Sequence, residues 1–157
     1  MQVIPEPRRV VVGVDGSSNS IAALRRASQE AARRHARLDV VRVLSTGPGH
    51  ADRLARSARE WGRLRALAAR IVPRPRQITT RLRVMYGEPA AVLTKVAQHA
   101  ELLVIGARVH SEHGNLLGGD TVPAVLQHAP CEVIICADHA TRLATPADPV
   151  PMPTEQP

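Results

Sequence analysis

Residues 102–121 read LLVIGARVHSEHGNLLGGDT, and they are the most informative part of the chain about its architecture. Its first four residues form an unbroken apolar run, which is typical of a strand buried on both faces of a parallel sheet. A glycine closes the run, a polar loop follows, and Asp120 stands where the N-cap of another helix is expected. A strand, a glycine-bounded loop and a helix N-terminus together can present backbone N–H groups to an anion. The stretch therefore predicts a ligand-binding crevice at the end of a buried strand.

On both sides of this stretch, apolar runs alternate with segments of helical periodicity. Strands are expected at 8–15, 38–44, 79–86, 102–106 and 132–137, and helices at 20–36, 51–71, 89–100 and 121–129. Helices of this length can cross over between parallel strands, so the order indicates an α/β fold, a five-stranded parallel doubly wound sandwich. Ligands of such sheets bind outside the carboxyl ends of the strands, where the strand order reverses. Asp15, after the first strand, and the loop after Gly106 should therefore face one crevice.

The folded domain is expected to span residues 8–138. Residues 1–7 form a flexible lead-in, and residues 139–157, rich in proline and poor in apolar side chains, form a disordered tail. No apolar run reaches the roughly 18 residues that a membrane span needs, and the first residues lack the apolar core of a secretion signal. We therefore expect a cytoplasmic protein, whose two cysteines, Cys131 and Cys136, stay reduced and hold no zinc.

The charge balance is strongly basic, with 21 Lys and Arg residues against 14 Asp and Glu residues and a net charge of +7. Such a balance can indicate nucleic-acid binding. However, the arginines are spread along the chain, and Trp61 and Tyr86 are the only Trp, Tyr or Phe residues, so no platform for stacking bases is present. The composition argues against a nucleic-acid partner and favours solvated basic helix faces.

Three segments resemble the universal stress protein family: VVVGVDGSSNSIAAL from residue 10, YGEPAAVLTKVAQHAELLVIGAR from residue 86, and LLGGDTVPAVLQHAPCEVIIC from residue 116. The resemblance covers about residues 8–137. It implies a cytoplasmic α/β fold with strand order 3-2-1-4-5, usually as a homodimer, in which some members bind ATP and others do not. In that order the strand Glu132–Ala137 lies at a sheet edge, where unpaired backbone groups favour pairing with a second chain. A homodimer through this strand is expected.

ATP-binding members of the family share a glycine motif: Gly, two residues, Gly, nine residues, Gly, then Ser or Thr. On this chain the first glycine is Gly106 and the third is Gly119. Val109 stands at the second glycine position, and Asp120 replaces the hydroxyl residue. The phosphate end of the motif is therefore altered.

The adenosine end of the motif matches the family better. By resemblance, Asp15 corresponds to the acidic residue near the ribose or a metal, and Val43 to the strand residue that contacts adenine. Arg108 matches a position that is often basic in the family. Together with His110 and His113 it can neutralise a smaller anion, although a loop in which these side chains have no role explains the sequence equally well.

The two altered positions disfavour phosphate binding for different reasons. A β-branched valine resists the positive φ that glycine permits close to phosphate oxygens. A carboxylate adds like charge and caps its own helix, so it occupies the amides that an external anion would use. Thr121 lies one residue too far along to replace the lost hydroxyl. Weakened or lost ATP binding is expected; the alternative is that both residues are packing and capping choices.

Three classes of function remain open. The first is a stress-response regulator that acts by dimerisation and partner contact, with ATP binding weakened or lost. The second is an adenine-nucleotide sensor, for ATP or a smaller nucleotide, or a slow ATPase. The third is a binder of nucleic acid or of an acidic partner. No nucleophile–base pair or metal-ligand cluster stands out in the sequence, so no catalytic or metal site is predicted.

Overall fold

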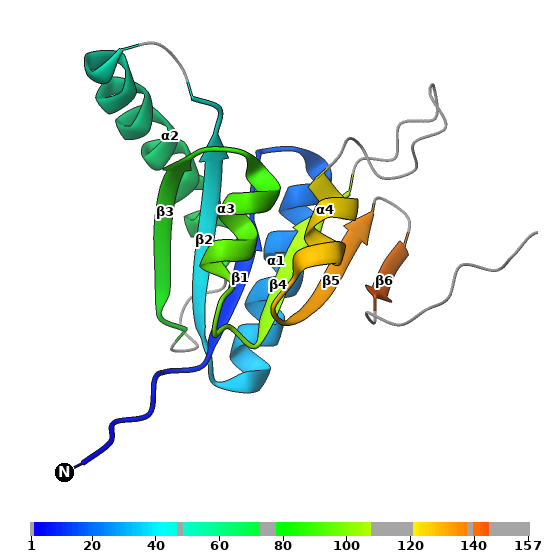
Figure 1. Ribbon diagram of the computed structural model, residues 1–157. Helices are drawn as coiled ribbons and strands as arrows, with labels where there is room; N and C mark the ends of the chain where they lie inside the picture. The colour runs from blue at the N-terminus through cyan, green and yellow to red at the C-terminus, as the bar shows by residue number, and fades with distance from the viewer. Residues whose placement is uncertain (1, 47–48, 73–77, 108–120, 138–139, 145–157) are drawn as a thin grey trace, which may run out of the picture.

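The computed structural model describes residues 2–46, 49–72, 78–107, 121–137 and 140–144 (Figure 1). Within these ranges the strands form one sheet in the order β3-β2-β1-β4-β5-β6. The strands are β1 (Arg9–Gly13), β2 (Arg37–Leu44), β3 (Thr80–Tyr86), β4 (Leu102–Gly106), β5 (Glu132–Ala137) and β6 (Ala140–Ala144). Strands β1 to β5 are parallel, so the predicted five-stranded order 3-2-1-4-5 is confirmed.

Helices cover both faces of the sheet. They are α1 (Ser18–Arg34), α2 (His50–Ile71), α3 (Pro89–Val96) and α4 (Thr121–His128). Helix α1 packs on β1, β4 and β5 and contacts α2, whereas α3 packs on β2 and against α4 on the opposite face. The side chain of Ser17 caps α1, and Glu88 caps α3 by accepting from the N–H groups of Ala90 and Ala91. These caps fix where two helices begin beside the carboxyl ends of the strands.

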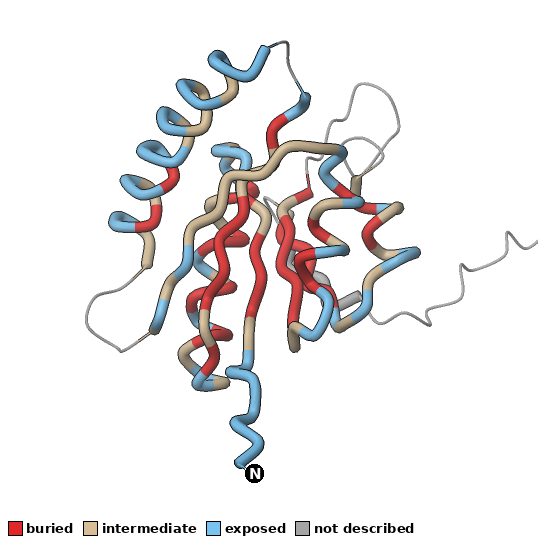
Figure 2. The backbone as a smooth tube through the Cα atoms, turned by 60° about the vertical axis from the view of Figure 1, so that its left-hand side comes forward, coloured by how far each residue is buried: buried red, intermediate tan, exposed pale blue. Residues whose placement is uncertain are grey.

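The centre of the sheet is fully buried, as the apolar runs predict. Val10, Val11 and Val12 of β1 and Leu102 to Val104 of β4 are 0 % exposed. Alternate residues point to opposite faces, so Val10 and Val12 join the core beneath α1 while Val11 joins the core beneath α3 and α4. The two cores therefore bury β1 and β4 on both faces of the sheet, and the buried centre of the sheet is red in Figure 2.

Helix α2 departs from the sequence prediction. Its periodicity predicts a buried stripe through Leu54, Ala58, Trp61, Leu64 and Ala68. Only Leu64 and Ala68 are buried; Leu54 is 75 % exposed and Trp61 is 43 % exposed. The prediction is wrong for the first half of the helix because that half rises beyond the ends of the strands (Figure 1), where no sheet surface covers it.

Strand β6 was not predicted. It runs antiparallel to β5, with Val133 opposite Ala144 and Ala137 opposite Ala140. The prediction of a disordered tail from residue 139 is therefore wrong for residues 140–144. The premise that Glu132–Ala137 is an edge strand is also wrong, because β5 pairs with β4 on one side and β6 on the other. The dimer itself stays a prediction.

Two truncations should separate the contribution of β6 from that of the tail. Ending the chain after Ala144 should change the unfolding temperature by less than about 2 °C, because the proline-rich remainder has little apolar surface to bury. Ending it after Ala137 should lower the unfolding temperature by roughly 5 °C, because β6 no longer satisfies the edge of β5. Scanning calorimetry measures both, and equal melting of the two shortened chains would show that β6 adds no stability.

Glu30 is the buried carboxylate of α1, 5 % exposed. It contacts Arg26 at 3.2 Å, Arg33 at 2.7 Å and Arg34 at 3.1 Å. Burial raises the pKa of Glu30, but the hydrogen bonds and charges of Arg33 and Arg34 together outweigh it and hold the pKa below its ordinary value of 4.5. The ionised carboxylate therefore stabilises the folded chain.

Replacing this carboxylate by an amide should destabilise the protein in a pH-dependent way. Because the folded pKa is lowered, the stabilisation is complete above the unfolded pKa, near 4.5, and is lost as the pH falls below it. Glu30→Gln should cost about 2 kcal/mol at pH 7 and progressively less in acid. Urea unfolding at several pH values measures this, with Glu6→Gln in the exposed lead-in as the control. A pH-independent difference would contradict the assignment.

Candidate functional site

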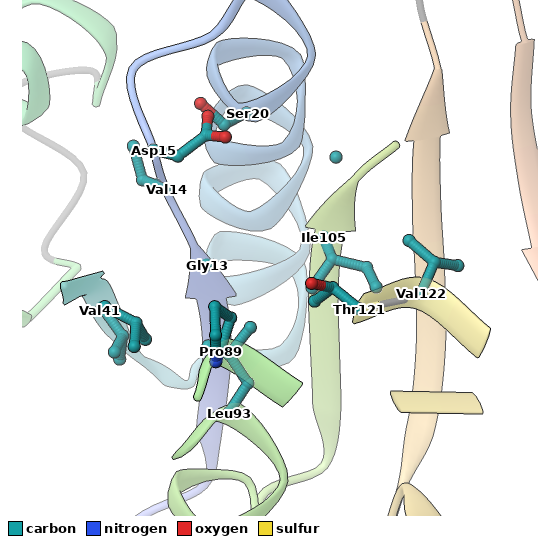
Figure 3. Close-up of a pocket in the computed structure, with 12 residues that line it drawn as sticks. Gly13, Val14, Asp15, Ser20, Val41, Pro89, Leu93, Ile105, Thr121 and Val122 are labelled. Atoms are coloured by element: carbon teal, nitrogen blue, oxygen red, sulfur yellow. The ribbon is translucent and has the colours of Figure 1, made fainter. Parts of the chain in front are cut away.

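A hollow of about 160 Å³ lies at the carboxyl ends of β1 and β4, where the strand order reverses (Figure 3). It is lined by Gly13, Val14, Asp15, Ser20, Val41, Val43, Pro89, Leu93, Ile105, Gly106, Thr121 and Val122. These residues come from β1, β2 and β4, from the start of three helices and from the turn between β1 and α1. The position is the one that the doubly wound topology predicts for a ligand.

Three of the predicted site residues meet at this hollow: Asp15, Val43 and Gly106. Asp15 is exposed, and its Oδ1 accepts a hydrogen bond from the backbone N–H of Ser17 at 2.9 Å. This bond shapes the turn from β1 into α1. The other predicted residues, Arg108, Val109, Gly119 and Asp120 together with His110 and His113, lie outside the described residues.

Sequence reasoning missed Pro89, Leu93 and Val122 as lining residues and set Thr121 aside. Pro89 and Leu93 of α3 form one wall, and Thr121 and Val122 of α4 contribute another. The spacing of Pro89 and Leu93 puts them on one helical face, but which strand end that face meets depends on the packing. Thr121 lines the hollow although it lies one residue past the hydroxyl position of the motif, so its dismissal as a site residue is wrong.

The start of α1 lies in close contact with the end of β4, and this contact fixes one side of the hollow. A Cβ on Gly106 would lie 2.6 Å from the carbonyl carbon of Asn19, so only glycine fits. Asn19 is 4 % exposed, and its amide Nδ2 donates to the backbone oxygen of Ala107. Its Oδ1 has no hydrogen-bond partner in the described part of the chain. Because these residues lie far apart in sequence, no local pattern reveals the contact.

The chemistry of the described lining is apolar, with a carboxylate at its rim. The polar side chains are those of Asp15, Ser20 and Thr121, and the Ser20 hydroxyl donates to the backbone oxygen of Ser17 at 2.9 Å. Within the described ranges, no Arg, Lys or His side chain lines the hollow. Apolar walls suit a flat base, and a carboxylate accepts hydrogen bonds from sugar hydroxyls. The described lining does not neutralise a chain of phosphates.

Asp15 also borders a second hollow, of about 210 Å³, on the side of the sheet that α2 covers. There Glu60 contacts Arg42 at 3.5 Å and Arg63 at 2.9 Å. One carboxylate thus holds both arginines, which lowers their availability for an external anion. The crevice at β1 and β4 is the better candidate site.

Other kinds of site find no support within the described ranges. No group of three His, Cys, Asp or Glu residues there could hold a metal ion. None of the helices described is long and apolar enough to cross a membrane. Cys131 and Cys136 are free thiols, and burial raises the pKa of both, which disfavours the reactive thiolate.

Known proteins resemble this chain in sequence. A model described as "Universal stress protein family" matches residues 6–137. A universal stress protein of Mycobacterium tuberculosis is 32 % identical over 146 residues, which cover 88 % of this chain and 49 % of the relative. The chain thus spans about half the length of the curated relatives it matches.

Solved structures resemble the fold closely. The universal stress protein UspA of Lactobacillus plantarum aligns with a TM-score of 0.69 at 23 % identity, over 85 % of this chain and 99 % of that one. A universal stress protein solved in complex with cAMP aligns with a TM-score of 0.63 at 28 % identity, over 83 % and 96 %. One from Archaeoglobus fulgidus, solved in complex with dAMP, aligns with a TM-score of 0.61 at 21 % identity, over 82 % and 97 %.

Proposed function

The chain belongs to the universal stress protein family, and on this premise we propose that it is a cytoplasmic stress-response regulator. Its crevice holds an AMP-type nucleotide in preference to ATP, and it acts by dimerisation and contact with a partner protein. The observation that carries the proposal is the lining of the hollow: apolar walls and the Asp15 carboxylate, without a basic side chain among the described lining residues.

The two ends of the crevice support different parts of this proposal. At the adenosine end, Asp15 and Val43 line one hollow at the strand ends. At the phosphate end, Val109 and Asp120 depart from the glycine motif. A nucleotide with a single phosphate needs less of the altered end than a triphosphate does. The relatives solved with cAMP and dAMP show that AMP-type ligands bind proteins of this fold.

Isothermal titration calorimetry with AMP, cAMP and ATP tests the preference. We expect AMP or cAMP to bind at least about tenfold more tightly than ATP, because the described lining does not offset the extra phosphate charge. Asp15→Asn should weaken AMP by about tenfold through a weaker acceptor for the ribose hydroxyls. Asp52→Asn, an exposed carboxylate on α2, should leave AMP binding unchanged. Tight ATP binding by the unmodified chain contradicts the proposal, and so does release of phosphate from ATP.

Dimerisation is the second part of the proposal. Because β6 covers β5, the full chain needs either the outer edge of β6 or displacement of β6 to pair two sheets. A chain ending after Ala137 bares β5 and should dimerise through Glu132–Ala137. Light scattering at tens of micromolar compares the two chains. If both are monomers, dimerisation through this side of the sheet is wrong.

A further inference from the structure

Strand β3 is an open edge of the sheet in the described part of the chain, because it pairs with β2 alone. The Gly87 N–H donates to the oxygen of Leu44 at 3.0 Å, and the Leu38 N–H donates to the oxygen of Thr79 at 2.9 Å. Odd-numbered residues of this segment therefore turn their backbone groups toward β2. The alternation of a parallel ladder directs the N–H and C=O groups of the even-numbered residues outward. The edge is a template for another strand.

Two arginines of β3 lie on the face of the sheet that carries α3. Arg81 stands opposite Asp39 and Arg83 opposite Val41 in the parallel register, and Val41 belongs to the core beneath α3 and α4. Helix α3 lies over β2 and β1 (Figure 1), and on this face of β3 Met85 packs against the core beneath α3 and α4. Arg81 is exposed and Arg83 half-buried. Neither forms an ion pair with a residue in the described ranges.

Asp39, the carboxylate that stands opposite Arg81 in the register, already binds other arginines. Asp39 is 0 % exposed. It accepts hydrogen bonds from Arg37 at 2.8 and 3.2 Å and from Arg9 at 3.2 Å. Since one buried carboxylate faces two arginines of its own, it does not neutralise those of β3. Among the described residues, this face of the β2–β3 edge therefore carries excess positive charge next to backbone groups that have no strand partner.

The charge decides which strand fits this edge. Antiparallel pairing with β3 of a second copy would set arginines of both chains on one face, and like charges on paired strands repel. The aromatic side chain of β3, Tyr86, already has the Arg53 guanidinium over its ring, 5.3 Å from the centroid, and donates its hydroxyl to the Arg53 backbone oxygen, so it is a poor platform for stacking bases. We propose that the edge of β3 binds an extended acidic segment of a partner protein as an added strand. Its backbone completes the ladder, and its carboxylates contact Arg81 and Arg83.

The test uses the full-length chain and a labelled decapeptide of alternating glutamate and valine, followed by fluorescence anisotropy in low salt. Arg81→Glu with Arg83→Glu should weaken binding by about tenfold or more, because both ion pairs become repulsive. The matched control, Arg59→Glu with Arg70→Glu on the exposed face of α2, makes the same change in net charge and should alter binding by less than about threefold. Circular dichroism verifies that each variant is folded.

Two further experiments test whether the peptide binds as an added strand. Val84→Pro removes an outward N–H while leaving the ladder to β2, so it should abolish peptide binding with both arginines intact. In the unmodified chain, the peptide should slow hydrogen exchange of the Leu82 and Val84 amides. Equal weakening by the α2 control, unchanged exchange of these amides, or tighter binding of a DNA duplex than of the peptide would each overturn the proposal. None of these readouts depends on nucleotide in the crevice.

Discussion

Replacing Val109 by glycine and Asp120 by serine should raise the affinity for ATP by about two to four orders of magnitude. A carboxylate about 5 Å from a phosphate charge costs on the order of 3 kcal/mol at an effective dielectric of 20. Holding a valine at the positive φ that the motif's second glycine permits costs roughly 1–3 kcal/mol more. A gain in affinity of about two orders of magnitude applies where solvent screens the charge of Asp120. Both residues lie outside the described part of the chain, so the expectation rests on the motif.

The single variants separate the two causes. Asp120→Ser alone should recover more affinity than Val109→Gly alone, because charge acts whatever the shape of the loop. Serine still caps a helix well, so the helix that begins at Thr121 should be retained. Calorimetry with ATP and AMP decides the matter. A folded double variant that still ignores ATP would show that the crevice rejects the triphosphate for another reason.

A methyl group on Gly106 should destabilise the fold more than most single changes in this chain. The added Cβ would lie 2.6 Å from the carbonyl carbon of Asn19 and 2.7 Å from the amide nitrogen of Ser20. Both neighbours are backbone atoms at the start of α1, so the helix itself has to move. We expect Gly106→Ala to cost about 3 kcal/mol and to lower the unfolding temperature by roughly 10 °C.

A second glycine provides the matched control. Gly62 lies within α2, and a Cβ there would meet no atom within 4 Å. Gly62→Ala should therefore stabilise the chain by about 0.5–1 kcal/mol through helix propensity alone. Thermal unfolding of both variants should give shifts of opposite sign. Similar destabilisation by both would mean that close packing at Gly106 is not the cause.

Local sequence patterns predicted the sheet and part of the site, and their failures share a cause. The apolar run of β4 and the valines of β1 are read correctly because burial on both faces leaves no polar position. Asp15 and Gly106 are placed correctly because parallel strands end at the same edge. Leu54 was misread, since periodicity identifies an apolar face without showing that anything covers it. Strand β6, with the sequence ATRLA, lacks the apolar run that marks β1 and β4, and its pairing with β5 is a tertiary event.

The residues that complete the crevice depend on contacts between distant segments. Asn19 and Ala107 are joined by a hydrogen bond across 88 positions of sequence. Leu93 reaches the hollow because α3 packs over the sheet. Its Cδ1 would lie 3.0 Å from a Cβ placed on Gly13 of β1. No single segment encodes either contact. Sequence therefore placed Asp15, Val43 and Gly106 at one hollow but did not predict its walls.

Because β6 is attached to the sheet only through its antiparallel pairing with β5 in the described chain, we expect it to open more easily than the central strands. Strands β1 and β4 are flanked by partners on both sides and packed beneath helices, so we expect their amides to exchange with solvent mainly when the whole domain unfolds. Strand β6 has β5 as its sole strand partner in the described chain and follows it after two residues, so it can detach and return without moving a crossover helix. We therefore expect β6 to open locally and expose β5 while β1 and β4 stay paired.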